Sequence, residues 1–382
     1  MKLKEIIVAS ALLLGAVRLC EAGTIYLTGS TAMRGSIYTT LRTAGSVFTG
    51  VPTTTTYEHS VAAGPSGANY MVFSGTLVGG SGTTVIKCHW SGSEGGIKDV
   101  VTGVSEVFVD DSIADGADHT ASPGTTISHN VDLAMADSSQ AFSRNKTPSL
   151  TTGQAVAVIT FTWVRNPGLW TGNNLSDSMI RQALGGVCKR AVFSGNAADV
   201  NDYVYVSGRD NQSGTRVNEF GECGFGIFTL PNQIEMDSSG NMLDLDPPNG
   251  TYAGDFGFSS GGTLAGTLGA NTTAKPDPFN GGSGYSVIAF LGRSDANTAI
   301  ANGAVELTVN GVAQSSAAVK EGTYTYWGNE YIYQKNGASS EAQSAYGRMV
   351  VSIPNDLNGT TAIKLTDMHC VRSGPTSDPT HN

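Results

Sequence analysis

The sequence predicts an α/β protein built from two domains. Three observations lead to this prediction. The chain has 382 residues, and domains usually contain about 100–200. Strand-like and helix-like segments alternate along it. Several strands also end in Gly/Ser turns that open helices. The composition, with 49 glycines and only 14% charged residues, fits an exported protein rich in strands and loops.

The first 22 residues have the pattern of a signal peptide. Lys2 and Lys4 precede an apolar run at residues 6–17, and polar sequence follows. We expect cleavage after Ala22. A membrane anchor is disfavoured, because about twelve apolar residues are fewer than the roughly twenty that span a bilayer. We therefore expect a periplasmic or secreted protein.

Cys20 leaves open a second form of export, a lipoprotein attached through this residue. We favour it less, because Arg18 and Leu19 stand where small residues are expected before a lipid-modified cysteine. Removal of the signal peptide leaves an even number of cysteines, which predicts two disulfides in an oxidising compartment. Of the three pairings that four cysteines allow, we expect Cys188–Cys223 and Cys88–Cys370.

The net charge and the spacing of histidines and cysteines indicate which binding partners and metal sites can be excluded. The formal net charge of −10 argues against nucleic acid and anionic membrane. It does not exclude an anionic ligand, because salt screens distant surface charges over about 8–10 Å. The histidines are scattered, and no Cys-x-x-Cys pair is present, so we expect neither a metal site nor a cofactor. The acidic loop near Asp110 does not fit the EF-hand calcium spacing.

The first half of the chain reads mainly as strands. We expect a strand at 24–28, a helix at 34–43 and a strand at 83–90 that runs into a Gly/Ser turn and a helix. Residues 99–131 contain a strand-like stretch at 106–109 and a polar acidic loop. An apolar strand at 131–135 then leads to Asp137.

The second half begins with the strongest β pattern. The later elements that we expect are a strand at 155–164, a helix at 175–184, a strand at 203–206, a helix from 213, loops over 236–283, a strand at 285–290, further strands to about 370, and a disordered tail after 372.

Three segments share the chemistry of an oxyanion site: Gly29–Ala32, Gly92–Gly95 and Ser213–Thr215. Each is a turn that opens a helix, where unpaired amides, the positive end of the dipole and a hydroxyl face outward. Any one of them alone is an ordinary N-cap. A fourth segment, 136–139, adds the Asp137 carboxylate at the end of an apolar strand.

The order of these segments resembles the phosphate-binding proteins of bacterial ABC transporters, a branch of the periplasmic binding proteins. The matching segments are Leu27–Ala32, the Gly-Ser-x-Gly-Gly run at 92–96, the strand that ends at Asp137, and the Arg-x-x-x-Ser-Gly-Thr motif at 209–215. The resemblance covers most of residues 24–335. Two features depart from it: the run Ala32-Met33-Arg34-Gly35, and the insertions at 99–131 and 236–283.

The resemblance implies a ligand site and a role for each of its residues. Hydroxyls of Thr31, Ser93, Ser213 and Thr215 and amides of Ala32, Gly214 and Thr215 would donate hydrogen bonds to phosphate. Arg209 would bind two ligand oxygens. Asp137 would accept a phosphate proton, and sulfate, which has no proton near neutral pH, would leave that carboxylate unpaired.

The resemblance also implies a two-lobed periplasmic-binding-protein-like fold with a ligand cleft between the lobes. Lobe 1 would comprise residues 23–149 plus 287–382, and lobe 2 residues 150–286. The expected function is an extracytoplasmic solute-binding protein, a monomer and not an enzyme, that captures phosphate or a similar oxyanion for an ABC transporter permease. Two alternatives stay open: a secreted structural or adhesive protein whose site has degenerated, and a phosphate-ester hydrolase.

Overall fold

The computed structural model describes residues 23–59, 61, 63–110, 114–150, 153–168, 171–245, 257–270, 277, 285–357, 359, 361–374 and 377–381. The predicted signal peptide, residues 1–22, and its Cys20 lie outside the described residues. Within the described ranges, no helix combines the length and the apolar character needed to cross a bilayer.

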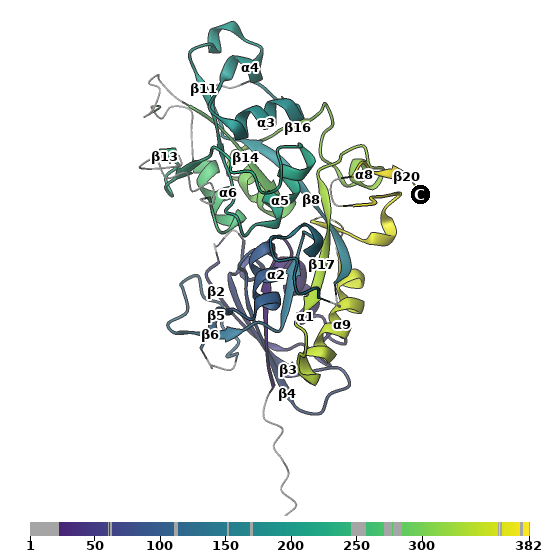
Figure 1. Cartoon of the computed structure of the whole chain (residues 1–382). Coiled ribbons are helices and arrows are strands. Elements are labelled where there is room, and N and C mark those ends of the chain that lie inside the picture. Colours follow the sequence, from purple (N-terminus) through teal and green to yellow (C-terminus); the bar gives the residue numbers. More distant parts are fainter. Residues whose placement is uncertain are drawn as a thin grey trace, which may run out of the picture.

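The chain forms an α/β fold of two lobes, as the sequence predicts (Figure 1). The first lobe, at the bottom of Figure 1, contains β1 (Gly23–Gly29), α1 (Arg34–Arg42), β2 (Thr53–Tyr57), β3 (Tyr70–Thr76), β4 (Thr83–His89), α2 (Ser93–Thr102), β5 (Ser105–Val109), β6 (Thr126–Asn130), β7 (Leu133–Ala136), β17 (Trp327–Gln334) and α9 (Ser340–Asp356).

The second lobe holds most of the remaining elements. They are β9 (Asn174–Leu175), α3 (Asp177–Gly185), β10 (Cys188–Lys189), α4 (Arg190–Ser194), β11 (Tyr203–Ser207), α5 (Gly214–Glu222), β12 (Ile234–Met236), β13 (Met242–Leu245), α6 (Gly261–Ala270), β14 (Ser286–Gly292), α7 (Arg293–Ala301), β15 (Val305–Glu306) and β16 (Thr308–Val309). The C-terminal part adds α8 (Ser316–Lys320), β18 (Ala362–Ile363), β19 (Cys370–Val371) and β20 (Thr380–His381). In this arrangement residues 287–309 lie with the second lobe, whereas the sequence prediction assigned them to lobe 1.

One strand, β8 (Gln154–Arg165), belongs to both lobes. Residues 154–160 pair with β17, and residues 161–165 pair with β14. The main sheet therefore continues from one lobe to the other, in the order β10-β11-β14-β8-β17-β7-β1-β4-β3-β2. The Val/Ile/Phe/Trp-rich sequence of β8 suits a strand that is buried on both faces, and residues 156–165 are all buried.

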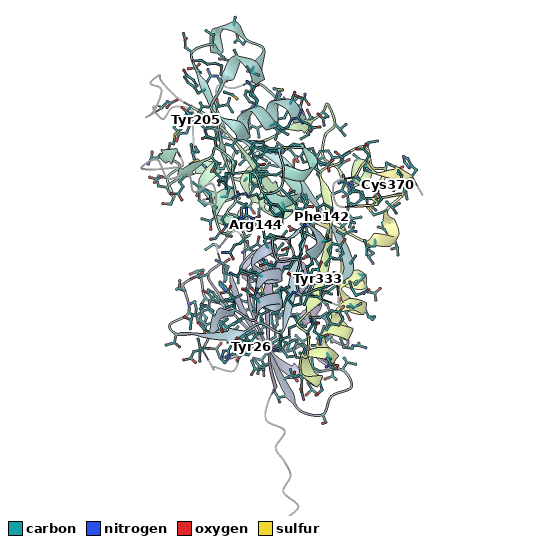
Figure 2. The ribbon with its side chains drawn as sticks, viewed as in Figure 1. Tyr26, Phe142, Arg144, Tyr205, Tyr333 and Cys370 are labelled. Carbon is teal, nitrogen blue, oxygen red and sulfur yellow. The ribbon has the colours of Figure 1, made fainter. Side chains whose placement is uncertain are left out.

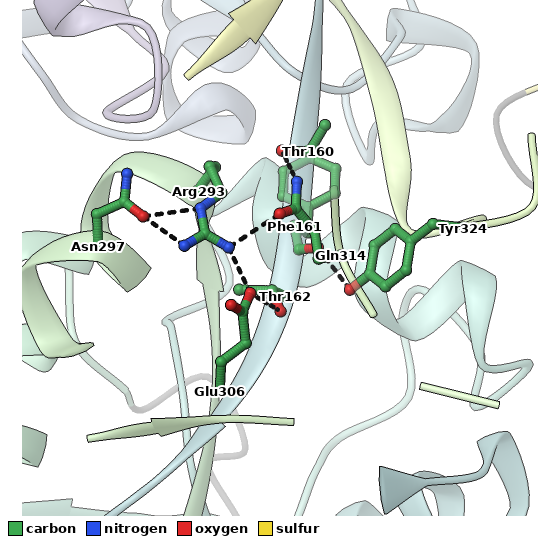
Figure 3. Close-up of polar contacts among 8 residues, drawn as sticks. All are labelled: Thr160, Phe161, Thr162, Arg293, Asn297, Glu306, Gln314 and Tyr324. Atoms are coloured by element: carbon green, nitrogen blue, oxygen red, sulfur yellow. Dashed lines mark hydrogen bonds and ion pairs between the residues drawn. The ribbon is translucent and has the colours of Figure 1, made fainter. Parts of the chain in front are cut away.

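A polar network fixes the middle of β8 to the second lobe (Figure 3). Arg293, at the start of α7, contacts Glu306 and donates 2.9 Å to Gln314 Oε1. Gln314 Nε2 in turn donates 3.1 Å to Thr160 Oγ1 on β8. Tyr324 donates 2.9 Å to the Phe161 carbonyl. The crossing point of β8 is thus held by several independent contacts.

Local signals in the sequence explain where several helices begin. Helix α3 starts after Ser176, whose Oγ accepts 3.3 Å from Met179 N, as an N-cap does. Helix α2 starts after Gly92, which has φ of 92°, a conformation that favours glycine. The predicted bounds of α1, β4 and β8 agree with the observed bounds to within one residue.

Three regions differ from the sequence prediction. Within 99–131 the strand predicted at 106–109 is present as β5, but it pairs with β6, which was not predicted, and His129 of β6 stacks on Tyr26 of β1 at 4.3 Å. Within 236–283, expected to be loops, residues 261–270 form α6, because Leu264 and Leu268 pack in the core of the second lobe. The tail includes β20, which pairs with β19.

The predicted disulfides are also wrong. The four cysteines of the described chain, Cys88, Cys188, Cys223 and Cys370, are all buried free thiols. Three of them donate to backbone carbonyls at 3.7 Å, Cys188 to Gly186, Cys223 to Phe220 and Cys370 to Val319. Figure 2 shows Cys370 beside α8 and β20, whereas Cys88 lies in β4 of the central sheet. An even count of cysteines indicated pairing, but all four are free thiols, and burial raises the pKa of each.

Candidate anion-binding site

The predicted site segments meet at the junction of the lobes. Ser93 is the first residue of α2, Asp137 follows β7, and Gly214 and Thr215 open α5. The Glu94 amide donates 2.9 Å to the Gln212 carbonyl, so the start of α2 contacts the loop before α5. Nearby, the Arg144 guanidinium lies 5.4 Å from the centre of the Phe228 ring; Figure 2 shows Arg144 at this junction.

Asp137 is the centre of this junction and is only 2% exposed. Ser93 Oγ donates 2.7 Å to its Oδ1, and Thr215 Oγ1 donates 3.4 Å to its Oδ2. Its backbone is fixed as well, since Asn218 Nδ2 donates 2.7 Å to its carbonyl. One carboxylate is therefore contacted by hydroxyls from both lobes.

The environment of Asp137 changes its acidity. Burial raises the pKa of Asp137 to about 6, while the Ser93 hydrogen bond and the Arg209 charge act in the opposite direction. A carboxyl group with this pKa exchanges a proton close to neutral pH. It is suited to accept a proton from a ligand whose own pKa lies in the same range.

Arg209 follows β11 and is also 2% exposed. Its Nε donates 2.9 Å to the Phe258 carbonyl, Nη2 donates 2.7 Å to the Ser259 carbonyl, and Nη1 donates 3.3 Å to Thr31 Oγ1. A guanidinium has five N–H donors, so three are used and two remain. Two N–H groups are the number needed to bind two oxygens of one oxyanion.

The other predicted residues lie around these two side chains. Thr31 is buried in the turn before α1 and joins Arg209, and Ala32 is the next residue in the same turn. Ser213 is the N-cap of α5, with Oγ accepting 3.3 Å from Arg216 N. The amides of Gly214 and Thr215 are the first two of that helix and have no intrahelical acceptor. Ligand binding by this set stays a prediction.

Gly214 makes the closest backbone approach to Asp137. A Cβ at this position would lie 1.6 Å from Asp137 Oδ1 and 2.6 Å from Ser93 Cβ. We expect Gly214→Ala to displace the start of α5 and to lower the free energy of unfolding by about 1–3 kcal/mol. Chemical denaturation measures the change.

The matched control for this substitution is Gly266→Ala, at an exposed position of α6 where a Cβ meets nothing within 4 Å. We expect this variant to be up to about 1 kcal/mol more stable than the wild type, because alanine is the better helix former. Equal effects of the two substitutions would contradict the packing described for Gly214.

Sequence reasoning missed a second pair of charges in the site. Arg34 of α1 donates 2.7 Å to Asn69 Oδ1 and lies 3.6 Å from Asp295 of α7. Burial lowers the pKa of Arg34 and raises the pKa of Asp295, and their mutual attraction opposes both changes. Arg209 interacts electrostatically with Asp137 as well as with this pair. The departure at Arg34 was visible in the sequence, but Asp295 gave no signal.

Buried Glu330 of β17 was also missed. Its Oε2 accepts 3.1 Å from Ser30 Oγ, and its Oε1 has no hydrogen-bond partner within the described chain. Burial and the nearby Asp137 raise the pKa of Glu330 well above its usual range. Its sequence context reads as an ordinary strand. Across the described ranges, no group of three or more His, Cys, Asp or Glu side chains is arranged to hold a metal ion.

Comparison with known proteins gives structural likenesses only. No family model matches the chain, and no curated protein matches it in sequence. Among solved structures it is similar to one described as a phosphate ABC transporter substrate-binding protein with bound phosphate, from Clostridium perfringens (13% identity, 90% of this chain and 100% of that one, TM-score 0.49). An ABC-type phosphate transport receptor from Vibrio cholerae is also similar (12% identity, 89% and 99% covered, TM-score 0.44). So is a high-affinity periplasmic phosphate-binding protein (12% identity, 93% and 96% covered, TM-score 0.48).

Proposed function

We propose that this protein is an extracytoplasmic solute-binding protein that captures phosphate, or a similar oxyanion, for the permease of an ABC transporter. One observation carries the proposal. The Asp137 carboxylate, the unused N–H groups of Arg209 and the open amides of α5 lie at one buried junction between two lobes. This combination offers donors for several oxygens and one acceptor for a proton.

The donors and the acceptor have different tasks in this proposal. Arg209 and the first amides of α5 bind oxyanion oxygens, since charge-assisted hydrogen bonds are the stronger class. Asp137 accepts the proton of phosphate. Sulfate carries no proton near neutral pH, so it would place a negative oxygen against a buried carboxylate, at a cost of several kcal/mol by order of magnitude.

Capture then links the two lobes. Ser93 and Asp137 come from the first lobe, and Arg209 and Thr215 from the second, so a ligand that contacts all four stabilises the closed arrangement. No bond is made or broken in this role, and release to the permease reverses the same closure. The role needs export, in agreement with the predicted signal peptide.

One observation favours a second candidate, a secreted structural or adhesive protein with a degenerate site. Both oxygens of Asp137 already accept hydrogen bonds from Ser93 and Thr215. The junction is therefore satisfied by the protein's own groups, and the lobes could remain joined without a ligand.

Phosphate analysis of the purified mature protein separates the two candidates. The sample, produced from residue 23 onward by cleavage of the signal peptide, is denatured and the released phosphate is measured; phosphate-depleted protein is then titrated by calorimetry. For a solute-binding protein we expect close to one phosphate released per chain and saturable uptake of phosphate but not of sulfate. Absence of heat with phosphate, arsenate and sulfate alike would leave the structural role.

A further inference from the structure

A cavity of about 380 Å³ lies beside the proposed phosphate site, between the lobes. Its walls include the first turns of three helices, α1, α6 and α7. The size falls in the usual range for a small-molecule pocket, about 300–1,000 Å³. Inorganic phosphate held at Arg209 and Asp137 does not need this space.

The cavity and the proposed phosphate site share one residue, Thr31. This residue lines the cavity, and its Oγ1 accepts 3.3 Å from Arg209 Nη1. The start of α6 packs closely on the same groups: a Cβ on Gly261 would lie 3.2 Å from Arg209 Nη1 and 2.1 Å from Asp295 Oδ2. Thr31 and Asp295 therefore line the cavity and also lie next to the Arg209 guanidinium.

Most of the wall is neutral and polar. Hydroxyl or amide groups are contributed by Ser36, Ser66, Asn69, Thr263, Ser294 and Thr298. No aromatic side chain is found among the described residues that line the cavity. This wall suits a group that both donates and accepts hydrogen bonds, and it offers no ring surface for stacking an aromatic group.

The charges of the wall exclude a second full anion. The lining contains one arginine, Arg34, and two carboxylates, Glu58 and Asp295, so it carries one net negative charge when all three groups are ionised. Carboxylates accept hydrogen bonds from hydroxyl groups, and Arg34 has N–H groups beyond those used on Asn69 and Asp295. A neutral group with several hydroxyls satisfies both kinds of partner.

We propose that the cavity is a subsite for the alcohol part of a phosphate monoester whose alcohol is a small polyol. The inference rests on the proposed function, since the phosphoryl group occupies the site at Arg209 and Asp137. A monoester keeps three terminal oxygens and a second pKa near 6. It therefore presents three oxygens and an exchangeable proton to that site, and its fourth oxygen carries the alcohol.

Calorimetry with three probes tests the subsite: inorganic phosphate, sn-glycerol 3-phosphate and ethyl phosphate. Ethyl phosphate is a monoester without free hydroxyls, so it separates hydroxyl recognition from simple tolerance of an ester. We expect sn-glycerol 3-phosphate to bind at least about tenfold more tightly than ethyl phosphate, as two or more additional hydrogen bonds predict. Equal affinity for the two esters would overturn the subsite.

Two tryptophan variants in and after α1 locate the binding. Ser36→Trp fills the cavity from its wall, whereas Ala44→Trp places the same side chain at an exposed position beyond the other end of the helix. We expect Ser36→Trp to weaken sn-glycerol 3-phosphate about tenfold or more while phosphate affinity changes less than about twofold. Ala44→Trp should leave both affinities unchanged.

The failures of the two proposals differ in this experiment. Wild-type protein that binds phosphate, but whose ester affinity is unaffected by Ser36→Trp, retains the proposed function and loses the subsite. Wild-type protein that binds none of the three probes contradicts the proposed function, and the subsite with it.

Discussion

Replacing Arg209 by lysine is expected to weaken phosphate binding by about a thousandfold. The ammonium keeps the charge but loses the planar pair of N–H groups that would bind two ligand oxygens. It also leaves the Phe258 and Ser259 carbonyls, which accept at 2.9 and 2.7 Å, without their donor. Loss of two charge-assisted hydrogen bonds corresponds to about 4 kcal/mol, which titration calorimetry resolves easily.

Arg293→Lys is the matched control for this substitution. Arg293 also forms several side-chain contacts, but they fix α7 and β15 near β8 and do not reach Asp137 (Figure 3). We expect its phosphate affinity to stay within about twofold of wild type. Denaturation of both variants shows whether each is folded. A folded Arg209→Lys protein whose phosphate affinity is within tenfold of wild type would contradict the binding of two ligand oxygens by Arg209.

Replacing Asp137 by asparagine is expected to change which oxyanion binds. The amide keeps an oxygen for the Ser93 hydroxyl, 2.7 Å away, and presents N–H donors where the carboxylate accepted. Phosphate then loses its proton acceptor, and sulfate no longer meets a like charge. We expect the preference for phosphate over sulfate to fall by about 10³-fold, which is about 4 kcal/mol. Competition between the two anions measures it, and an unchanged preference would contradict the role given to Asp137.

The same variant has a defined effect on stability. Because burial raises the pKa of Asp137 to about 6, from an ordinary value near 4, ionisation of this group opposes folding. The protonated carboxyl group contributes to the free energy of unfolding. This contribution is fully present below about pH 4 and is lost as the pH rises through about 6. The loss above pH 7 is about 3 kcal/mol by order of magnitude. Without ligand, Asp137→Asn should therefore gain stability relative to wild type between pH 4 and pH 8, and denaturation at both pH values tests this. An equal difference at the two pH values would contradict it.

The parts of the fold that the sequence predicts well are those with local causes. The Ser176 cap determines where α3 begins, and the β-branched run of residues 155–164 specifies a buried strand. Three of the site loops could also be found, because a glycine turn, a hydroxyl and a helix start occur together in a few residues. Their meeting at Asp137 could be expected only from the resemblance, since loops from separate lobes share no local pattern.

The features that the sequence did not reveal depend on tertiary packing. Asp295 lies in a helix and becomes part of the site only because Arg34, far away in sequence, reaches it at 3.6 Å. Helix α6 begins with two glycines, which are poor helix formers, and is held by the packing of Leu264 and Leu268. The cysteine prediction failed for the same reason: an even count says nothing about distances between thiols.

The continuity of β8 has a mechanical consequence. In a protein whose halves are joined by loops, the halves swing freely. Here the same strand is hydrogen-bonded to β17 on one side of the crossing and to β14 on the other. Relative rotation of the halves must be absorbed as torsion of a pleated ribbon, whose natural twist is about 20° per strand pair. We therefore expect the hydrogen bonds of β8 to both neighbouring strands to stay intact in the open and the closed arrangement of the lobes. The twisted strand then supplies an elastic restoring force between the two arrangements.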